Sequence, residues 1–153
     1  MSRKSVYGLE ELRSGACSPE KYLVPGARAL LEALRQRGLK LYLASGTDEP
    51  YMQDEARLLD LERYFDGGLH DALDDYKSFS KAILIQRILA SAECRGYEFL
   101  GFGDGYVEIE NVRQVGGVTV GIATAEPVCL EVDAWKRQRL VVVGADFIIP
   151  NYL

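Results

Sequence analysis

EFLGFGDGYVEIENVRQVGGVTVGIA, residues 98–123, is the stretch that decides the fold of this chain. EFLGFG (98–103) is a short and nearly continuous apolar run, which is typical of a strand buried on both faces. YVEIENVRQVGG (106–117) predicts a helix ended by a pair of glycines, and VTVGIA (118–123) predicts a second buried strand. A strand, a helix and a strand in succession form a unit whose two strands run parallel.

The same alternation extends in both directions from this stretch. Apolar residues at helical spacing and capping residues at the ends predict further helices over residues 25–38, 48–61, 79–93 and 133–145, the last capped by Asp133. Two more apolar runs, LKLYLA (39–44) and DFIIP (146–150), predict strands. We therefore expect an α/β fold, a Rossmann-like three-layer sandwich with a parallel sheet and helices on both of its faces.

One segment between these elements breaks the pattern. FDGGLHDALDDYKS (65–78) is rich in turn residues, holds one short strand at most, and ends at Ser78, which we expect to open the next helix. It contains His70, the single histidine, which we expect on the surface of a polar turn. One histidine excludes a His-rich metal site and any mechanism that needs two imidazoles.

Composition and charge exclude several classes of partner. The 153 residues carry 18 Lys and Arg against 23 Asp and Glu, a net charge of −5 without a basic stripe, so the electrostatic footprint of nucleic-acid binding is missing. No apolar run near the N-terminus is long enough for a signal peptide or a membrane span. The three cysteines, Cys17, Cys94 and Cys129, are too far apart for a disulfide framework or a zinc site. We expect a cytoplasmic protein whose partners include neither nucleic acid nor a membrane.

Ser45 and Gly46 directly follow the predicted strand 39–44, where the chain enters a helix. In an open parallel sheet, ligands bind outside the carboxyl ends of the strands. Backbone amides and the helix dipole favour an anion at this position, and the Ser45 hydroxyl can donate a hydrogen bond to a phosphate oxygen. An ordinary helix N-cap is the alternative interpretation, and this short segment taken alone favours it.

Asp104 and Glu108 form a second candidate site, directly after the predicted strand 98–103. Two carboxylates four residues apart can converge on Mg²⁺, which takes one or two protein carboxylates and completes its octahedron with water and phosphate. Alternatively, Asp104 caps the helix and Glu108 is a solvated surface charge. Dinucleotide binding is disfavoured, because the glycines here lack the third position of the G-x-G-x-x-G pattern.

Two lysines, Lys77 and Lys81, stand near the start of the helix that precedes the Asp104 strand. A lysine at such a helix start can reach the carboxyl edge of the sheet and add positive charge beside a phosphate. Most lysines in such places are only solvated.

The order of these features resembles motifs two, three and four of the haloacid dehalogenase (HAD) phosphohydrolase superfamily. The matching pieces are strand-S-G-T, a lysine at a helix start, and strand-G-D-G-x-x-E. Four segments are similar in sequence to the HAD phosphatase-like domains associated with ribokinase-type sugar kinases. They are LYLASGTDE, YKSFSKAILIQRIL, GFGDGYVEIENVRQVGG and DAWKRQRLVVVGADFIIPNY. The likeness covers the chain from about Pro25 to its end. It implies a Rossmann-like fold and a Mg²⁺-dependent aspartyl-phosphate mechanism.

The resemblance also implies a role for each matching residue. Ser45, together with Gly46, would bind the transferring phosphoryl group, and Lys81 would neutralise its charge. Asp104 would ligate Mg²⁺, with Glu108 in the second acidic position. Lys77 is the alternative for the lysine role; Lys81 is preferred for its shorter spacing to Asp104 and its place before the helix's apolar face.

The first motif of that superfamily, an Asp-x-Asp that supplies the nucleophile, does not occur in these 153 residues. A covalent step needs a carboxylate in line with phosphorus, so the chain as given is predicted to be inactive. Asp146 does not replace it, because it stands at the start of a predicted strand. Residues 1–24 then resemble the remnant of a helical cap or linker, and residues 25–153 the HAD-like core domain.

Two functional hypotheses follow from this departure. The first is the C-terminal core of a phosphatase acting on a small phosphorylated metabolite such as a sugar phosphate. The second is a non-catalytic module that keeps a Mg²⁺ and phosphate pocket, or serves interaction, without turnover. In the family the motif-one strand lies between the strand before Ser45 and the strand before Asp104. These two strands are therefore expected to pair directly or to recruit a second copy of the chain as a homodimer.

Overall fold

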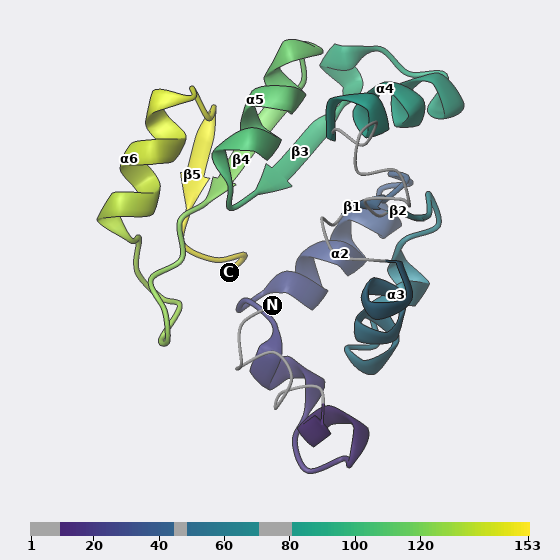
Figure 1. The fold of residues 1–153 in the computed structure, drawn as a ribbon, viewed down its shortest axis with the longest axis vertical. Coiled ribbons are helices and arrows are strands. Elements are labelled where there is room, and N and C mark those ends of the chain that lie inside the picture. The colour runs from purple at the N-terminus through teal and green to yellow at the C-terminus, as the bar shows by residue number, and fades with distance from the viewer. Residues whose placement is uncertain (1–9, 45–48, 71–80) are drawn as a thin grey trace. The chain divides into compact units, whose positions relative to one another are not determined.

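The computed structural model describes residues 10–44, 49–70 and 81–153. Contacts divide the chain into two compact units, Met1–Tyr76 together with Leu153, and Lys77–Tyr152 (Figure 1). We describe each unit by itself. The division expected at residue 24 is a different boundary and stays a prediction.

The first unit contains short helices and one pair of strands. Residues 10–13 are helical, and the further elements are η1 (Pro19–Tyr22), α2 (Ala27–Gln36), β1 (Leu43–Ala44), α3 (Glu49–Leu58), η2 (Glu62–Tyr64) and β2 (Leu69–His70). The helix expected over 25–38 is confirmed as α2. It ends where Gly38 takes a left-handed φ of 74°, a conformation that suits glycine, and the Leu39 amide donates back to the Leu34 carbonyl.

β1 and β2 pair in parallel, with Leu43 opposite Leu69 and Ala44 opposite His70. β1 is much shorter than the strand expected over 39–44. Before β1, the Leu41 amide donates to the Asp66 carboxylate and the Leu41 carbonyl accepts from the Gly67 amide, so these groups bond to the loop before β2. The expectation that His70 lies in a turn is wrong, since it belongs to β2.

The second unit is built from the stretch that opened the sequence analysis and its flanks. Its elements are α4 (Lys81–Ala92), η3 (Gly96–Glu98), β3 (Leu100–Gly103), α5 (Tyr106–Gln114), β4 (Val118–Ile122), α6 (Ala134–Val142) and β5 (Phe147–Ile149). Each strand and helix predicted between residues 98 and 150 is therefore confirmed. The start of α4 at Ser78 lies outside the described residues.

The three strands of the second unit form a parallel sheet in the order β3-β4-β5, visible in Figure 1 with α5 and α6 beside it. Both helices pack on the same face of this sheet. Gly101 on β3 lies against Val112 of α5, and Gly121 on β4 lies against Leu140 of α6. These glycines lie on one face, because Gly101 and Gly103 oppose Thr119 and Gly121 in the ladder. The small residues let both helices approach the strands closely.

Ile109, Ala123 and Leu140 form the fully buried centre of this unit. Val143, Ala145 and Ile148 pack against them. The parallel α/β architecture expected from the sequence is confirmed. The ladders of the described residues belong to two sheets, β1-β2 and β3-β4-β5, and the direct pairing of the strands before Ser45 and Asp104 is not among them.

Candidate functional site

The carboxyl ends of β3, β4 and β5 meet at one edge of the three-stranded sheet because the strands are parallel. Asp104 follows β3, Thr124 lies just beyond β4, and Pro150 follows β5. The residues around these three positions form the candidate site.

Glu108 folds back over the loop that carries Asp104. A Cβ atom added to Gly103 would lie 2.8 Å from the Glu108 Cβ, and one added to Gly105 would collide with the Glu108 carboxylate oxygen Oε2. The absence of side chains at both glycines therefore leaves the space that the Glu108 side chain fills. Asp104 stands between the two glycines, and the Glu108 side chain on α5 reaches back to the same loop.

Tyr152 is a residue of this edge that the sequence analysis missed. Its ring makes an edge contact with Phe102 on β3, with the ring centroids 6.0 Å apart. Burial raises the pKa of the Tyr152 phenol, and the negative charge of Asp104 raises it further. The rule that drew attention to Ser45 and Asp104, a position just beyond the carboxyl end of a strand, also applies to the residues after β5.

Two hydrogen bonds hold the segment that carries Tyr152. The Thr124 hydroxyl donates to the Pro150 carbonyl at 2.6 Å, and the Asn151 amide nitrogen donates to the Cys129 carbonyl at 2.9 Å. Thr124 and Asn151 are both buried. Figure 1 shows the chain turning after β5 towards the tip of β3, so the C-terminal segment lines this edge.

The donor set suits a hard cation. Asp104 and Glu108 offer carboxylate oxygens, which Mg²⁺ prefers, and the glycine loop leaves room for the Glu108 carboxylate beside Asp104. Within residues 10–44, 49–70 and 81–153, no three His, Cys, Asp or Glu side chains gather as a metal cluster. A cation here would therefore need further ligands such as water or phosphate.

The remaining predicted site residues are not placed with these two. Ser45, Gly46 and Lys77 lie outside the described residues. Lys81 is the first residue of α4, but its side chain is not described. The roles of Ser45, Gly46 and Lys81, and the choice between Lys81 and Lys77, stay predictions.

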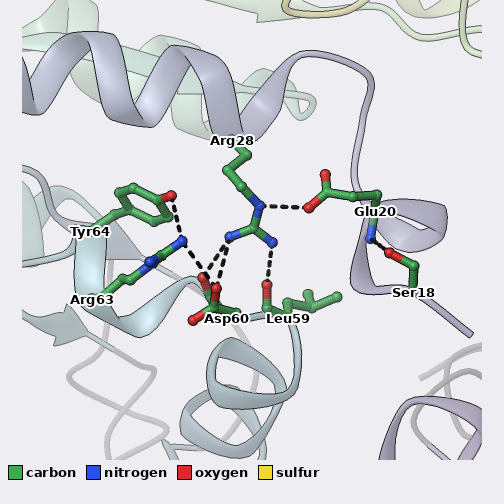
Figure 2. A network of polar contacts seen from close by, with 7 residues as sticks. All are labelled: Ser18, Glu20, Arg28, Leu59, Asp60, Arg63 and Tyr64. Atoms are coloured by element: carbon green, nitrogen blue, oxygen red, sulfur yellow. Dashed lines mark hydrogen bonds and ion pairs between the residues drawn. The ribbon is translucent and has the colours of Figure 1, made fainter. Parts of the chain in front are cut away.

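The first unit carries a polar network centred on Arg28 (Figure 2). The guanidinium of Arg28 donates to the Glu20 carboxylate at 2.6 Å, the Asp60 carbonyl at 2.7 Å and the Leu59 carbonyl at 2.8 Å. It also lies over the ring of Tyr64 and lines an open hollow of about 490 Å³. The Arg28 guanidinium is engaged by the chain itself, so this network ties α2 to the segment after α3.

Comparison with protein families gives one match. Residues 3–116 match the family described as haloacid dehalogenase-like hydrolase. No curated protein matches the chain. In the described part of the chain, no helix has the length and apolar character needed to cross a membrane.

Solved structures resemble the chain in fold. A protein described as a β-phosphoglucomutase from Thermotoga maritima is 24% identical with a TM-score of 0.67, over 82% of this chain and 55% of that one. A HAD family hydrolase from Deinococcus radiodurans, with bound phosphate and sodium, is 15% identical with a TM-score of 0.70, over 84% and 55%. A protein from Clostridium difficile described as a phosphatase is 18% identical with a TM-score of 0.69, over 84% and 56%. The chain thus spans little more than half the length of these structures.

Proposed function

The chain belongs to the haloacid dehalogenase-like hydrolase family, and from this premise we propose that it is the core of a Mg²⁺-dependent phosphatase. Its substrate class in this proposal is a small phosphorylated metabolite such as a sugar phosphate, handled in the cytoplasm. The similarity of its sequence to HAD domains associated with sugar kinases supports a phosphorylated sugar as the substrate. The structure from Deinococcus radiodurans holds a phosphate, which is consistent with a phosphoryl ligand.

The observation that carries the proposal is the loop Gly103-Asp104-Gly105 with Glu108 folded over it. In the proposal, Asp104 ligates Mg²⁺ and Glu108 is the second acidic residue of the metal site. Mg²⁺ bound there would stabilise negative charge on the phosphoryl oxygens. Ser45 and Gly46 would hold the phosphoryl group at the N-terminus of α3, and Lys81 would neutralise it.

The nucleophile is the part that these 153 residues do not supply. No Asp-x-Asp occurs in the sequence, and the Asp146 carboxylate accepts hydrogen bonds from the amide and the hydroxyl of Thr119 at the opposite end of the strands. We therefore propose that the 153-residue chain alone does not turn over phosphate esters.

The missing Asp-x-Asp also favours a second candidate function. In it the chain is a binding or interaction module that keeps Mg²⁺ and phosphate binding without hydrolysis. We further propose that the free edges of its strands allow a homodimer, which sedimentation velocity of the purified chain over a range of concentrations would test.

Isothermal titration calorimetry with Mg²⁺ tests the proposed metal site. We expect weak binding to the wild-type chain and at least a tenfold loss in Asp104→Asn, because a coordinating carboxylate is removed. Glu110→Gln is the matched control, since Glu110 is an exposed acidic residue on the same helix as Glu108. Equal heats for wild type and Asp104→Asn would contradict the assignment.

A further inference from the structure

Arg139 on α6 lies against two aromatic rings from different helices. The centre of its guanidinium is 4.6 Å from the ring centroid of Trp135 and 5.1 Å from that of Tyr106. Trp135 stands one helical turn before Arg139, whereas Tyr106 is the first residue of α5. The guanidinium therefore bridges the two helices that cover one face of the sheet.

In the described part of the chain, Arg139 has ring contacts but no counter-ion. Among the residues that the structure describes, no carboxylate pairs with Arg139 and no acceptor takes a hydrogen bond from it. Arg113 on the neighbouring helix differs, because it donates to the Val143 carbonyl at 2.9 Å. A guanidinium has five N–H donors in its plane, and contacts with ring faces attract its positive charge but give these donors no acceptor.

The surroundings of Arg139 are open to solvent. Trp135 is 67% exposed and Tyr106 is 45% exposed, so both rings that hold the guanidinium are accessible to solvent. Two rings that hold the guanidinium restrict its rotamers, so less side-chain entropy is lost when it binds an anion. This is a preorganised donor group facing water.

The Arg139 guanidinium lies at the same edge of the sheet as the candidate site. Tyr106 is two residues beyond Asp104, at the amino end of α5, where the carboxyl end of β3 leads into the helix. The amino end of α6, with Trp135 as its second residue, follows the loop after β4 at the same edge. The guanidinium thus belongs to the end of the sheet that carries Asp104 and Glu108.

We propose that Arg139, held by Trp135 and Tyr106, binds an oxyanion, a phosphate or carboxylate group, at the junction of α5 and α6. A planar guanidinium binds both groups through two parallel N–H···O bonds. Assigning this oxyanion to a second anionic group of the substrate rests on the proposed function. The binding itself does not depend on it.

Trp135 is the single tryptophan of the sequence, so its fluorescence reports on this group alone. The experiment titrates the full chain with sodium phosphate, and separately with sodium acetate, at constant ionic strength without Mg²⁺. We expect a saturable change in emission with at least one of the two anions, and the stronger binder identifies the preferred group. In Arg139→Gln the midpoint should rise at least tenfold, and in Arg139→Lys by less, because the charge remains while the planar donor pair is lost.

Arg137→Gln is the matched control and should titrate as the wild type does. Arg137 is an exposed residue of the same helix that contacts neither ring. Far-UV circular dichroism of each variant shows whether the fold is kept. Failure to saturate with either anion, or an unchanged midpoint in folded Arg139→Gln, would overturn the proposal.

A further variant separates this proposal from the proposed function. Asp104→Asn should lose Mg²⁺ binding but keep the phosphate or acetate titration of Trp135. Loss of that titration in a folded Asp104→Asn chain would contradict an anion site at Arg139 that is independent of the acidic loop.

Discussion

At the scale of single residues, the two glycines around Asp104 are as important to the candidate site as its carboxylates. Gly103 and Gly105 provide space, and Glu108 occupies it. Neither has a left-handed φ. Their role is thus the close approach of a side chain to the backbone, and not an unusual backbone conformation.

Replacing Gly105 by alanine should weaken Mg²⁺ binding severalfold with little change in stability. The new methyl group would collide with the Glu108 carboxylate, which is the far end of a flexible side chain and can move away. Calorimetry with Mg²⁺ and urea unfolding would measure the two effects. Gly101→Ala is the contrasting control, because its methyl group would meet a Val112 methyl at 2.5 Å and should cost about 1–3 kcal/mol of stability. Unchanged Mg²⁺ affinity in Gly105→Ala would contradict the role given to Glu108.

Asp146 stabilises the opposite end of the sheet. Its Oδ2 accepts hydrogen bonds from the amide of Thr119 at 2.8 Å and from the hydroxyl at 2.9 Å. These bonds lower the pKa of the Asp146 carboxyl from its ordinary value of 3.8. Thr119 is fully buried, so it has no water to replace this acceptor.

Asp146→Asn should lower the free energy of unfolding at pH 7 by about 1 kcal/mol, a low value for a charged acceptor because Asp146 is exposed. A depressed folded-state pKa contributes stability above the unfolded-state value, and this contribution is lost as pH falls through the folded-state pKa. The difference between wild type and variant should therefore shrink below about pH 4. Urea unfolding at pH 7, 5 and 3 measures it, and a difference that stays constant down to pH 3 would exclude the carboxylate as its source.

At the scale of elements, the capping residues read from the sequence at α6 and at the end of α5 are confirmed, whereas the alternative that Asp104 caps α5 is wrong, because the N-cap of α5 is Gly105 without a side-chain hydrogen bond. Asp133 accepts a hydrogen bond from the Lys136 amide at 2.8 Å and begins α6. The Gly116-Gly117 pair ends α5, with the Gly117 amide bonded to the Val112 carbonyl. These signals are local, so they do not depend on what packs around them.

Asp133→Ala should destabilise α6 by about 1 kcal/mol, the usual loss of a side-chain N-cap. Asp133→Ser keeps a cap and should lie close to the wild type. Unfolding in urea, followed by the fluorescence of Trp135 in the same helix, measures both variants. Equal midpoints for Asp133→Ala and wild type would show that α6 begins without help from this cap.

Strand length is the element property that the sequence predicts least well. The apolar run 39–44 satisfies a strand pattern along its whole length, yet only Leu43 and Ala44 join the ladder. Leu41 of this run bonds instead to Asp66 and Gly67. Strand pairing depends on a distant partner that a local pattern does not contain.

At the scale of the whole molecule, family membership predicts hydrolysis whereas the 153-residue sequence lacks an Asp-x-Asp. We expect no release of p-nitrophenol from p-nitrophenyl phosphate above the buffer rate, with Mg²⁺ present, because the sequence lacks the Asp-x-Asp that would supply a nucleophile. A continuous absorbance assay for p-nitrophenol, with the purified chain and with buffer alone, measures this rate. Turnover that is abolished in Lys81→Ala would show that another residue of this chain acts as the nucleophile.

The sequence by itself determined the parallel α/β class, the order of its elements, and the two acidic residues beyond β3. These follow from apolar periodicity, caps and the rule for strand ends, all of which are local. Tertiary structure alone decided that Glu108 lies over Gly105, that Tyr152 returns to Phe102, and that Arg139 meets Tyr106. Each of these contacts depends on how closely a helix or loop approaches a strand, and packing sets that distance through side chains far apart in the chain.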